Sequence, residues 1–336
     1  MMKVAVVILN WNGKSFLEKF LPSVVSNSKG ADLWVIDNAS TDDSVTFLEQ
    51  NYSEIRIVRN KMNSGFAKGY NDGLDSISAD IYVLLNSDIE VTPGWLDPVC
   101  ELLEKNPEIA ACQPKVRSYS RREYFEHAGA AGGFMDKFSY TFCRGRIFAE
   151  TEKDLGTYDD SCEIFWSTGA CMFIKAEDFH RQNGFDEDFF AHMEEIDLCW
   201  RLKNEGKKIW YCAESLVYHV GGGTLDYKSP RKTFLNFRNN LYTITKNYRS
   251  GMLSFHIYNR LMLDGIAAVK FLFALQFRHI WAVIKAHYNY FWKLPSMLKK
   301  RRKLRSNLSI NNTGTYPKSI VWQAFVKKNR KYSDLD

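Results

Sequence analysis

The chain has 336 residues, 45% of them hydrophobic, which is enough apolar material for one large domain or two ordinary ones and excludes disorder throughout. Its seven cysteines are odd in number and form no Cys-x-x-Cys pair, which argues against a disulfide framework or a zinc ribbon and favours a reducing compartment. The net charge of +6 conceals a division, because residues 1–227 carry 23 basic and 36 acidic side chains whereas residues 228–333 carry 22 basic side chains and one acid. We therefore expect an acidic body and a basic tail that suits a polyanionic partner.

The first 85 residues alternate short apolar runs with helix-like segments. The runs are residues 4–9, 33–36, 55–58 and 81–85, and apolar residues at helical spacing follow the first run over residues 14–26. An N-cap signal at residues 40–43 predicts a second helix, and glycines open a weaker third helix over residues 69–77. The first run is too short for a signal-peptide core, so we expect a first strand and a cytoplasmic protein. This alternation predicts an α/β fold with a mainly parallel sheet covered by helices on both faces.

The rest of the acidic body is less regular. Residues 109–190 are punctuated by glycine and predict long loops or a small antiparallel extension beside the sheet. A helix is expected around residues 193–204, followed by strands around 209–211 and 216–220. The body is expected to close near residue 225.

Oxygen-bearing side chains follow the fourth apolar run, at the carboxyl end of a strand where open α/β sheets bind ligands. They belong to Asn86, Ser87 and Asp88. Carboxylate, carbonyl and hydroxyl oxygens suit a hard cation such as Mg²⁺ or Mn²⁺. An ordinary strand-end turn rich in Asn, Ser and Asp is the alternative.

The second and third runs are followed by residues that suit a nucleotide. Asp37 could accept hydrogen bonds from a base or a ribose, or it could only shape the turn. The next stretch contains Asn63, Gly65, Gly69 and Asn71, and glycines with free N–H groups at a helix start attract phosphate. The stretch lacks the closing Gly-Lys-Ser/Thr of a Walker loop, so a nucleotide site here would be of another kind.

Two later stretches carry titratable groups. Glu194, Glu195 and Asp197 lie at the start of the helix expected around residues 193–204. First-turn acids are ordinary in helices, but adjacent carboxylates raise one another's proton affinity, which makes one of them a candidate general base. His219 ends a strand before a glycine-rich loop. A lone histidine is usually structural, whereas one beside a carboxylate site is a candidate metal ligand.

Taken in order, these motifs resemble the family-2 glycosyltransferases, and within them the rhamnosyltransferase-like members of bacterial cell-surface polysaccharide synthesis. The resemblance covers about residues 3–240 and rests on Asn10-Trp-Asn, Asp37, the stretch 63–71, Asn86-Ser-Asp88, Glu194-Glu-x-Asp-Leu and His219. It implies the GT-A fold, in which a nucleotide-binding α/β sheet is joined to an acceptor-binding half. It also implies transfer of a sugar from a nucleoside-diphosphate sugar with inversion at the anomeric carbon.

The resemblance also gives the nucleotide-side residues their roles. Asp37 would contact the base, while Asn10 and the loop 63–71 would line the nucleotide. Asp88 and His219 would hold the metal that bridges the two phosphates. The family's commonest metal motif begins with aspartate where this chain has Asn86.

On the acceptor side, the second acid of the family's Glu-Asp pair falls on Glu195, which would be the general base. Because that acid is one methylene longer here, Glu194 and Asp197 are kept as alternatives for the role. Trp166 and Gly169 lie in a segment that resembles the one preceding the acceptor site, where Trp166 could stack on a sugar ring or pack in the core. Arg238 resembles the arginine of a family Arg-Asn pair and could meet the diphosphate of the donor or of a lipid carrier.

The basic tail contains no uncharged run long enough for a spanning helix. If residues 260–285 formed one helix, its charged side chains would share one arc opposite an apolar face, as in a helix that lies in a membrane interface. Those charged residues are Arg260, Asp264, Lys270, Arg278 and Lys285. The basic run 299–305 could bind anionic headgroups. Packing on the catalytic body and a homodimer interface are alternatives, and nucleic acid is least favoured because no recognisable nucleic-acid module is present.

These observations predict a GT-A domain over residues 1–225, with a nucleotide-sugar half at about 1–110 and an acceptor half at about 111–225. Residues 226–336 would form a basic helical region at the inner face of the cell membrane. The expected function is metal-dependent, inverting glycosyl transfer to a glycan, especially a lipid-linked one. Two alternatives remain: a sugar-phosphate nucleotidyltransferase, whose basic glycine loop after the first strand is missing here, and a non-catalytic, membrane-docked nucleotide-sugar-binding protein.

Overall fold

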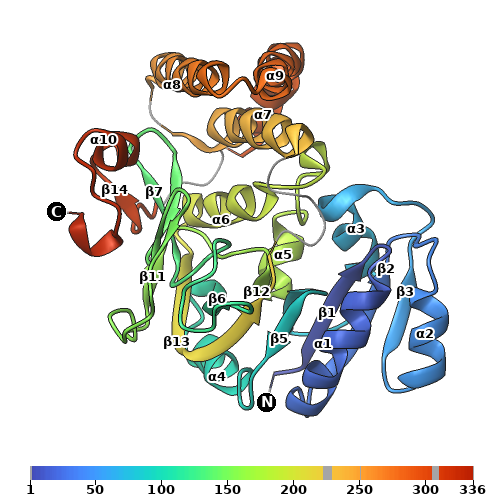
Figure 1. Ribbon diagram of the computed structural model, residues 1–336. Helices are drawn as coiled ribbons and strands as arrows, with labels where there is room; N and C mark the ends of the chain where they lie inside the picture. The colour runs from blue at the N-terminus through green and yellow to red at the C-terminus, as the bar shows by residue number, and fades with distance from the viewer. Residues whose placement is uncertain (1, 222–228, 250, 305–309, 336) are drawn as a thin grey trace.

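The computed structural model describes residues 2–221, 229–249, 251–304 and 310–335 (Figure 1). Its main sheet has nine strands, in the order β11-β13-β6-β12-β4-β1-β2-β3, with β5 paired to β13. Their bounds are β1 (Val4–Asn10), β2 (Asp32–Asp37), β3 (Arg56–Arg59), β4 (Ile81–Asn86), β5 (Ile89–Val91), β6 (Ile109–Ser118), β11 (Cys162–Ile164), β12 (Cys171–Lys175) and β13 (Lys208–His219).

Helices cover both faces of this sheet. Alternate residues of β1 enter two different hydrophobic clusters, with Ala5 and Val7 in one and Val6 and Ile8 in the other. The body helices are α1 (Lys14–Asn27), α2 (Ser44–Asn51), α3 (Gly65–Leu74), α4 (Asp97–Lys105), α5 (Ala176–Arg181), the 3₁₀ helix η1 (Glu187–Phe189) and α6 (Glu194–Asn204). The expected α/β architecture, a mainly parallel sheet flanked by helices, is therefore confirmed.

The middle of the chain contributes more to the main sheet than the sequence predicted. Besides loops, residues 109–190 supply β6 and β12, which lie between β13 and β4. The prediction missed β6 because Gln113, Pro114, Lys115 and Arg117 interrupt its apolar pattern. The same region also forms most of a small second sheet, β10-β9-β8-β7-β14. Its strands are β7 (Gly133–Asp136), β8 (Thr141–Cys143), β9 (Arg146–Ile147), β10 (Glu150–Thr151) and β14 (Thr315–Tyr316).

Two predictions of element boundaries were wrong. The strands expected around residues 209–211 and 216–220 are the single strand β13, whose pairing with β6 shifts register between Cys212 and Leu216. The helix expected over residues 260–285 is broken, because Leu275 has a φ of 55° between α8 (Leu253–Phe273) and α9 (Phe277–Lys303). A left-handed residue ends an α-helix, so the two segments fold back as a hairpin. All seven cysteines are free thiols, as expected.

The C-terminal helices lie on the α6 side of the body and are stacked over it (Figure 1). Helix α7 (Pro230–Asn247) contacts α6, α8 and α9. The chain then returns to the small sheet, where β14 pairs with β7 and is followed by α10 (Ile320–Phe325) and η2 (Tyr332–Asp334). Elements of the basic region therefore pack directly on elements of the acidic body.

Candidate active site

The carboxyl ends of β1, β2 and β4 bring the strand-end residues to one edge of the sheet. Asn10 is paired in register with Asp37, and Leu9 with Asn86. Backbone hydrogen bonds connect the ends of β1 and β2 and the residue after β3. The amide N of Asn60 donates to the Asp37 carbonyl, and the amide N of Asn38 donates to the Asn10 carbonyl. The predicted nucleotide-side residues therefore do converge.

Asn10 and Asp37 are both buried at this edge. Asn10 Nδ2 lies 3.4 Å from Asp37 Oδ1, and the amide N of Ser40 donates to Asp37 Oδ2 at 3.1 Å. Asp37 thus shapes the turn after β2, which was the alternative reading of this residue. Asn10 Oδ1 is a buried acceptor without a hydrogen-bond partner among the described residues, and a buried polar atom of this kind needs a donor such as a ligand N–H.

The loop before α3 is held by asparagine side chains. Asn63 Oδ1 accepts from the Gly65 amide at 3.0 Å and from Asn38 Nδ2 at 3.1 Å. Asn71 donates to and accepts from the backbone of Phe185, at 2.8 and 2.9 Å. Asn71 therefore joins α3 to the segment before η1, and both its polar side-chain atoms are occupied by protein.

The two predicted phosphate-approach glycines are required by the protein itself. A Cβ on Gly65, whose φ is +88°, would lie 2.5 Å from the Phe190 carbonyl oxygen. A Cβ on Gly69 would lie 2.9 Å from Asn38 Nδ2. In this structure, these glycines allow segments of the chain to approach each other closely.

Asp88 and His219 meet although 130 residues separate them in the chain. Strand β5 begins directly after Asp88 and runs antiparallel to the end of β13, which places Ile89 opposite His219. His219 Nε2 lies 3.1 Å from Asp88 Oδ1, and Nδ1 lies 3.1 Å from Glu126 Oε2. Burial alone would lower the pKa of His219, but the carboxylates of Asp88 and Glu126 outweigh it and raise the pKa to about 10.

The donor set at Asp88 and His219 fits a divalent cation. A buried carboxylate oxygen and a buried imidazole nitrogen converge here, and Mg²⁺ or Mn²⁺ commonly takes few protein ligands and completes its shell with phosphate oxygens and water. No group of three or more His, Cys, Asp or Glu side chains that could hold a metal is found in the described part of the chain. Glu126 would then act behind His219 by fixing its ring, as carboxylates behind metal-binding histidines do.

Glu194 and Glu195 begin α6, and one carboxylate oxygen of each is buried without a hydrogen-bond partner among the described residues. Burial and the neighbouring Glu195 raise the pKa of Glu194 well above its usual range. Burial raises the pKa of Glu195 to about 7, while backbone N–H groups at the helix start oppose this rise. Of the two, Glu195 is the one that can exchange a proton near neutral pH.

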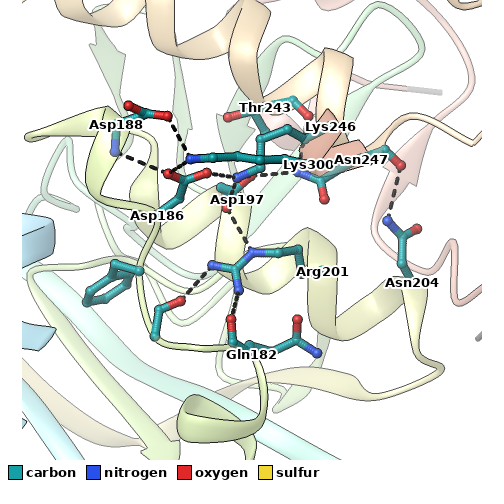
Figure 2. Close-up of polar contacts among 12 residues, drawn as sticks. Gln182, Asp186, Asp188, Asp197, Arg201, Asn204, Thr243, Lys246, Asn247 and Lys300 are labelled. Carbon is teal, nitrogen blue, oxygen red and sulfur yellow. Dashed lines mark hydrogen bonds and ion pairs between the residues drawn. The ribbon is translucent and has the colours of Figure 1, made fainter. Parts of the chain in front are cut away.

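Asp197, the third acid of this group, is fully buried and committed to structure (Figure 2). Arg201 Nε donates to it at 2.9 Å, Asn247 Nδ2 at 2.7 Å, and Lys246 Nζ lies 2.8 Å away. Arg201 also donates to the backbone of Gln182 and 184. These partners occupy both carboxylate oxygens of Asp197.

The acceptor-side candidates have different surroundings. Gly169 lies beside Glu195, since a Cβ placed on it would be 3.7 Å from Glu195 Cβ and 3.6 Å from Phe66 Cζ. Trp166 is only 4% exposed, packs on Gly133 and donates from Nε1 to the Phe134 carbonyl at 2.9 Å. The surroundings of Trp166 are those of the core-packing alternative.

Arg238 lies on α7 and faces the segment before α6. Its Nη2 donates to the carbonyls of Asp188 and Phe189, at 3.1 and 3.0 Å, and its Nε donates to Asn239 Oδ1 at 2.8 Å. Burial lowers the pKa of this guanidinium, although Tyr242 and Asp188 oppose the shift. The Nε and Nη2 groups of Arg238 are thus used by the chain.

The sequence analysis missed Glu126 and Asn239. Glu126 lies in the irregular region and follows no recognisable motif, so no local signal identified it. Asn239 was visible only as part of the Arg-Asn pair, and the contacts described below depend on a segment about 50 residues earlier in the chain.

Comparisons with known proteins agree with this geometry. The sequence matches the family "Glycosyl transferase family 2" over residues 5–173, half of the chain. An N-acetylglucosaminyl-diphospho-decaprenol L-rhamnosyltransferase of Mycobacterium tuberculosis is 23% identical over 239 residues, which covers 64% of this chain and 75% of that protein. The rhamnosyltransferase WbbL of Escherichia coli is 41% identical over 54 residues, covering 16% of this chain and 20% of WbbL.

Solved glycosyltransferases share the fold. A mannosyltransferase from Pyrobaculum calidifontis in complex with GDP-Man and Mn²⁺ matches 87% of this chain and 88% of its own, at a TM-score of 0.55 and 12% identity. GalNAc-T7 with UDP, GalNAc and Mn²⁺ matches 65% of this chain and 43% of its own, at a TM-score of 0.53 and 17% identity. These neighbours have the GT-A fold, as expected from the sequence. The chain belongs to glycosyl transferase family 2.

Proposed function

We propose that this transferase moves a sugar, with inversion, from a nucleoside-diphosphate sugar to a lipid-linked glycan in cell-surface polysaccharide synthesis. The observation that carries the proposal is Glu195. One of its carboxylate oxygens is buried with no hydrogen-bond partner among the described residues, its pKa is about 7, and it lies beside Gly169, which also adjoins the donor-side Phe66. A group with these properties is suited to take a proton at neutral pH.

In the proposed reaction the acceptor hydroxyl oxygen attacks the anomeric carbon from the face opposite the diphosphate. Glu195 takes the hydroxyl proton, the new glycosidic bond forms, and the bond to the diphosphate oxygen breaks with its electron pair. Mg²⁺ or Mn²⁺ held by Asp88 and His219 would supply positive charge beside the leaving diphosphate. Asn10, with its unpartnered acceptor, and Asp37 would face the nucleotide base.

The lipid-linked acceptor is proposed partly because of the C-terminal hairpin, α8 and α9. Both helices expose apolar side chains at spacings of 3 or 4 residues, which places each set on one helix face. We call this surface the apolar face of the hairpin, and its members are Met262, Ile266, Val269, Phe273, Phe277, Trp281, Ile284, Tyr288 and Trp292, each at least half exposed.

The charged side chains of the hairpin support contact with an anionic membrane. The sequence analysis placed Arg260 and Asp264 on a charged arc opposite the apolar face. In the structure they are buried against the body, where they pair at 2.9 Å and His287 Nε2 lies 3.2 Å from Asp264. Lys270 and Lys285 remain exposed near the apolar face. Exposed apolar side chains flanked by lysine suit a lipid interface with anionic headgroups. None of the helices in the described ranges is long and apolar enough to cross a bilayer.

The decisive experiment is donor turnover. Purified protein is incubated with UDP-, dTDP- and GDP-sugars, a polyprenyl-diphosphate-linked glycan, and Mg²⁺ or Mn²⁺, and released nucleoside diphosphate is measured before and after chelation. We expect metal-dependent release from one donor that is lost in Asp88→Ala and Glu195→Gln. Nucleotide binding with no turnover in the presence of acceptor would favour the non-catalytic binding protein, and absence of nucleotide binding would overturn the proposal.

A further inference from the structure

The turn that carries Glu195 into place is held in an unfavourable backbone conformation. We call residues 190–193 the base turn, and within it Phe190, His192 and Met193 have φ values of 66°, 69° and 74°. Left-handed φ values are unfavourable for non-glycine residues, so surrounding contacts must maintain the turn. On the donor side, the Phe190 carbonyl accepts a hydrogen bond of 2.7 Å from the amide N of Phe66 in α3. The base turn therefore joins the base-bearing helix α6 to the donor-side helix α3.

The contacts on the other side of the base turn come from α7. Asn239 is fully buried, and its Nδ2 lies 3.0, 2.9 and 2.7 Å from the carbonyl oxygens of Phe189, Ala191 and His192. Because the base turn contains left-handed residues, three backbone carbonyls point towards the side-chain amide of Asn239. The Asn239 side chain thus satisfies backbone acceptors that the turn leaves without helix partners.

The segment before the base turn is held by ion pairs from α7 and α9 (Figure 2). Lys300 Nζ lies 2.5 Å from Asp186 Oδ1 and 2.7 Å from Asp188 Oδ2. Lys246 Nζ lies 2.5 Å from Asp186 Oδ2 and 2.8 Å from Asp197 Oδ1. The two lysines therefore connect α9 and α7 to both ends of the segment that carries the base turn.

These ion pairs lower the pKa of Asp186. Burial would raise the pKa of Asp186, but Lys246 and Lys300 hold it well below its usual range. Removing one partner of a buried pair leaves an uncompensated charge, which is strongly unfavourable. Without Lys300, the carboxylates of Asp186 and Asp188 would repel each other next to the base turn.

We infer that Asn239 and Lys300 are positioning residues for Glu195. From α7 and α9 they hold the base turn and the segment before it, and this sets the start of α6 against α3. The inference rests on the proposed function, because it takes Glu195 as the base. It makes helices of the basic C-terminal region part of the catalytic apparatus, in addition to any role in membrane contact.

The test compares Lys300→Met with Lys299→Met in the full chain. Both changes remove one positive charge at the same end of α9, so any loss of attraction to anionic membrane is common to both. Lys299 is exposed and has no ion pair with any residue that the structure describes, whereas Lys300 is only 34% exposed and binds two carboxylates. We expect kcat to be about 10- to 100-fold lower in Lys300→Met than in Lys299→Met, with the same donor KM in both variants.

Two further variants sharpen the test. Lys300→Arg should restore most of the lost kcat, because a guanidinium can bridge two carboxylates. Asn239→Ala should reproduce the kcat defect through the base turn itself. Equal kcat values in Lys300→Met and Lys299→Met, or a change confined to the donor KM, would overturn the inference.

Hydrogen exchange separates failure of this inference from failure of the proposed function. Lys300→Met should accelerate amide exchange over residues 186–197, and Lys299→Met should not, whether or not a donor has been found. If the wild-type protein shows no transferase activity but exchange responds in this way, only the proposed function fails. Unchanged exchange in Lys300→Met rules out the positioning role.

Discussion

At the scale of single residues, the site depends on carboxylates with different surroundings. Glu194 and Glu195 are adjacent in the chain, yet burial and the neighbouring Glu195 raise the pKa of Glu194 well above its usual range, whereas burial raises the pKa of Glu195 to about 7. Asp197 is only two residues further on, and its carboxylate forms ion pairs with Arg201 and Lys246. One turn of helix therefore contains a candidate base and an acid that is held in ion pairs.

The first prediction concerns the pH dependence of activity. Glu195 must be deprotonated to accept the acceptor proton, and its pKa is raised to about 7 by burial. We therefore expect kcat/KM to fall about tenfold per pH unit below pH 7 and to be level above it. A pH–rate profile with saturating metal measures this. A profile that stays level down to pH 5 would exclude Glu195 as the base.

The second prediction concerns the stability cost of this base. A carboxyl group whose pKa is raised by folding binds its proton more tightly in the native state, so its ionisation destabilises the fold above that pKa. Glu195→Gln should therefore lose about 10²- to 10⁴-fold in kcat while raising Tm at pH 8.5 relative to wild type. At pH 4.5 the gain in Tm should vanish, because the wild-type carboxyl is then protonated in the native state. Thermal melts at both pH values test the sign.

The third prediction assigns a role to Glu126. Its carboxylate lies 3.1 Å from His219 Nδ1 and fixes the imidazole ring. Glu126→Ala should raise the Mn²⁺ concentration needed for half-maximal activity about 10- to 100-fold, with a smaller effect on kcat at saturating metal. Metal titrations of wild type and variant decide this. An unchanged metal requirement would show that His219 does not need this partner.

At the scale of elements, the contact between α3 and the base turn joins the two halves of the site. It requires Gly65, because its φ is +88° and a Cβ would meet both the carbonyl and the ring of Phe190. The start of α3 and the base turn therefore pack directly against each other, so a shift of one would displace the other.

The fourth prediction uses two glycines with the same backbone conformation. Gly30 has a φ of +89° with open space around its Cβ position, whereas Gly65 has a φ of +88° and no space. Both Ala variants should lose about 1 kcal/mol from backbone strain, but only Gly65→Ala should also lower kcat. Equal activity in the two variants would show that the base turn tolerates displacement.

At the scale of the whole molecule, the C-terminal hairpin turns Arg260 and Asp264 towards the body and its apolar face outward. Arg260 and Asp264 face the small sheet, where the Arg260 guanidinium lies 3.8 Å from the centre of the Tyr140 ring. This orientation leaves the aromatic side chains of the apolar face available to a lipid surface, on the same helical layer that holds the base turn.

The fifth prediction tests that surface. Trp281→Ser combined with Trp292→Ser should weaken binding to anionic vesicles about tenfold or more, because each indole would bury apolar area in the interface. Trp322→Ser is the matched control, since Trp322 is as exposed as Trp281 but lies on α10. Vesicle sedimentation at low and high salt separates the apolar contribution to binding from the electrostatic contribution, which salt screens. Dimerisation lost in the double variant, with vesicle binding intact, would instead identify a homodimer interface.

The sequence by itself determined the features that have local signatures. Apolar runs and helical spacing identified β1–β4, α1 and α6, and the polar residues after those strands pointed to Asn10, Asp37 and Asp88. The start of α6 likewise drew attention to Glu195, because several acids in one helical turn are visible in the chain itself. The spacing of apolar residues and the polar residues after a strand depend only on neighbouring positions in the chain, so both could be recognised from the sequence alone.

Only the tertiary structure decided which distant residues meet. The pairing of β13 with β5 brings His219 to Asp88, and the loop after β6 brings Glu126 to His219. Packing of α7 on α6 brings Asn239 and Lys246 to the base turn and to Asp197, and the hairpin turns Arg260 inward. These contacts join residues about 50 to 130 positions apart, and no spacing along the chain encodes them. They form because buried charges and backbone carbonyls require partners, which only the folded arrangement supplies.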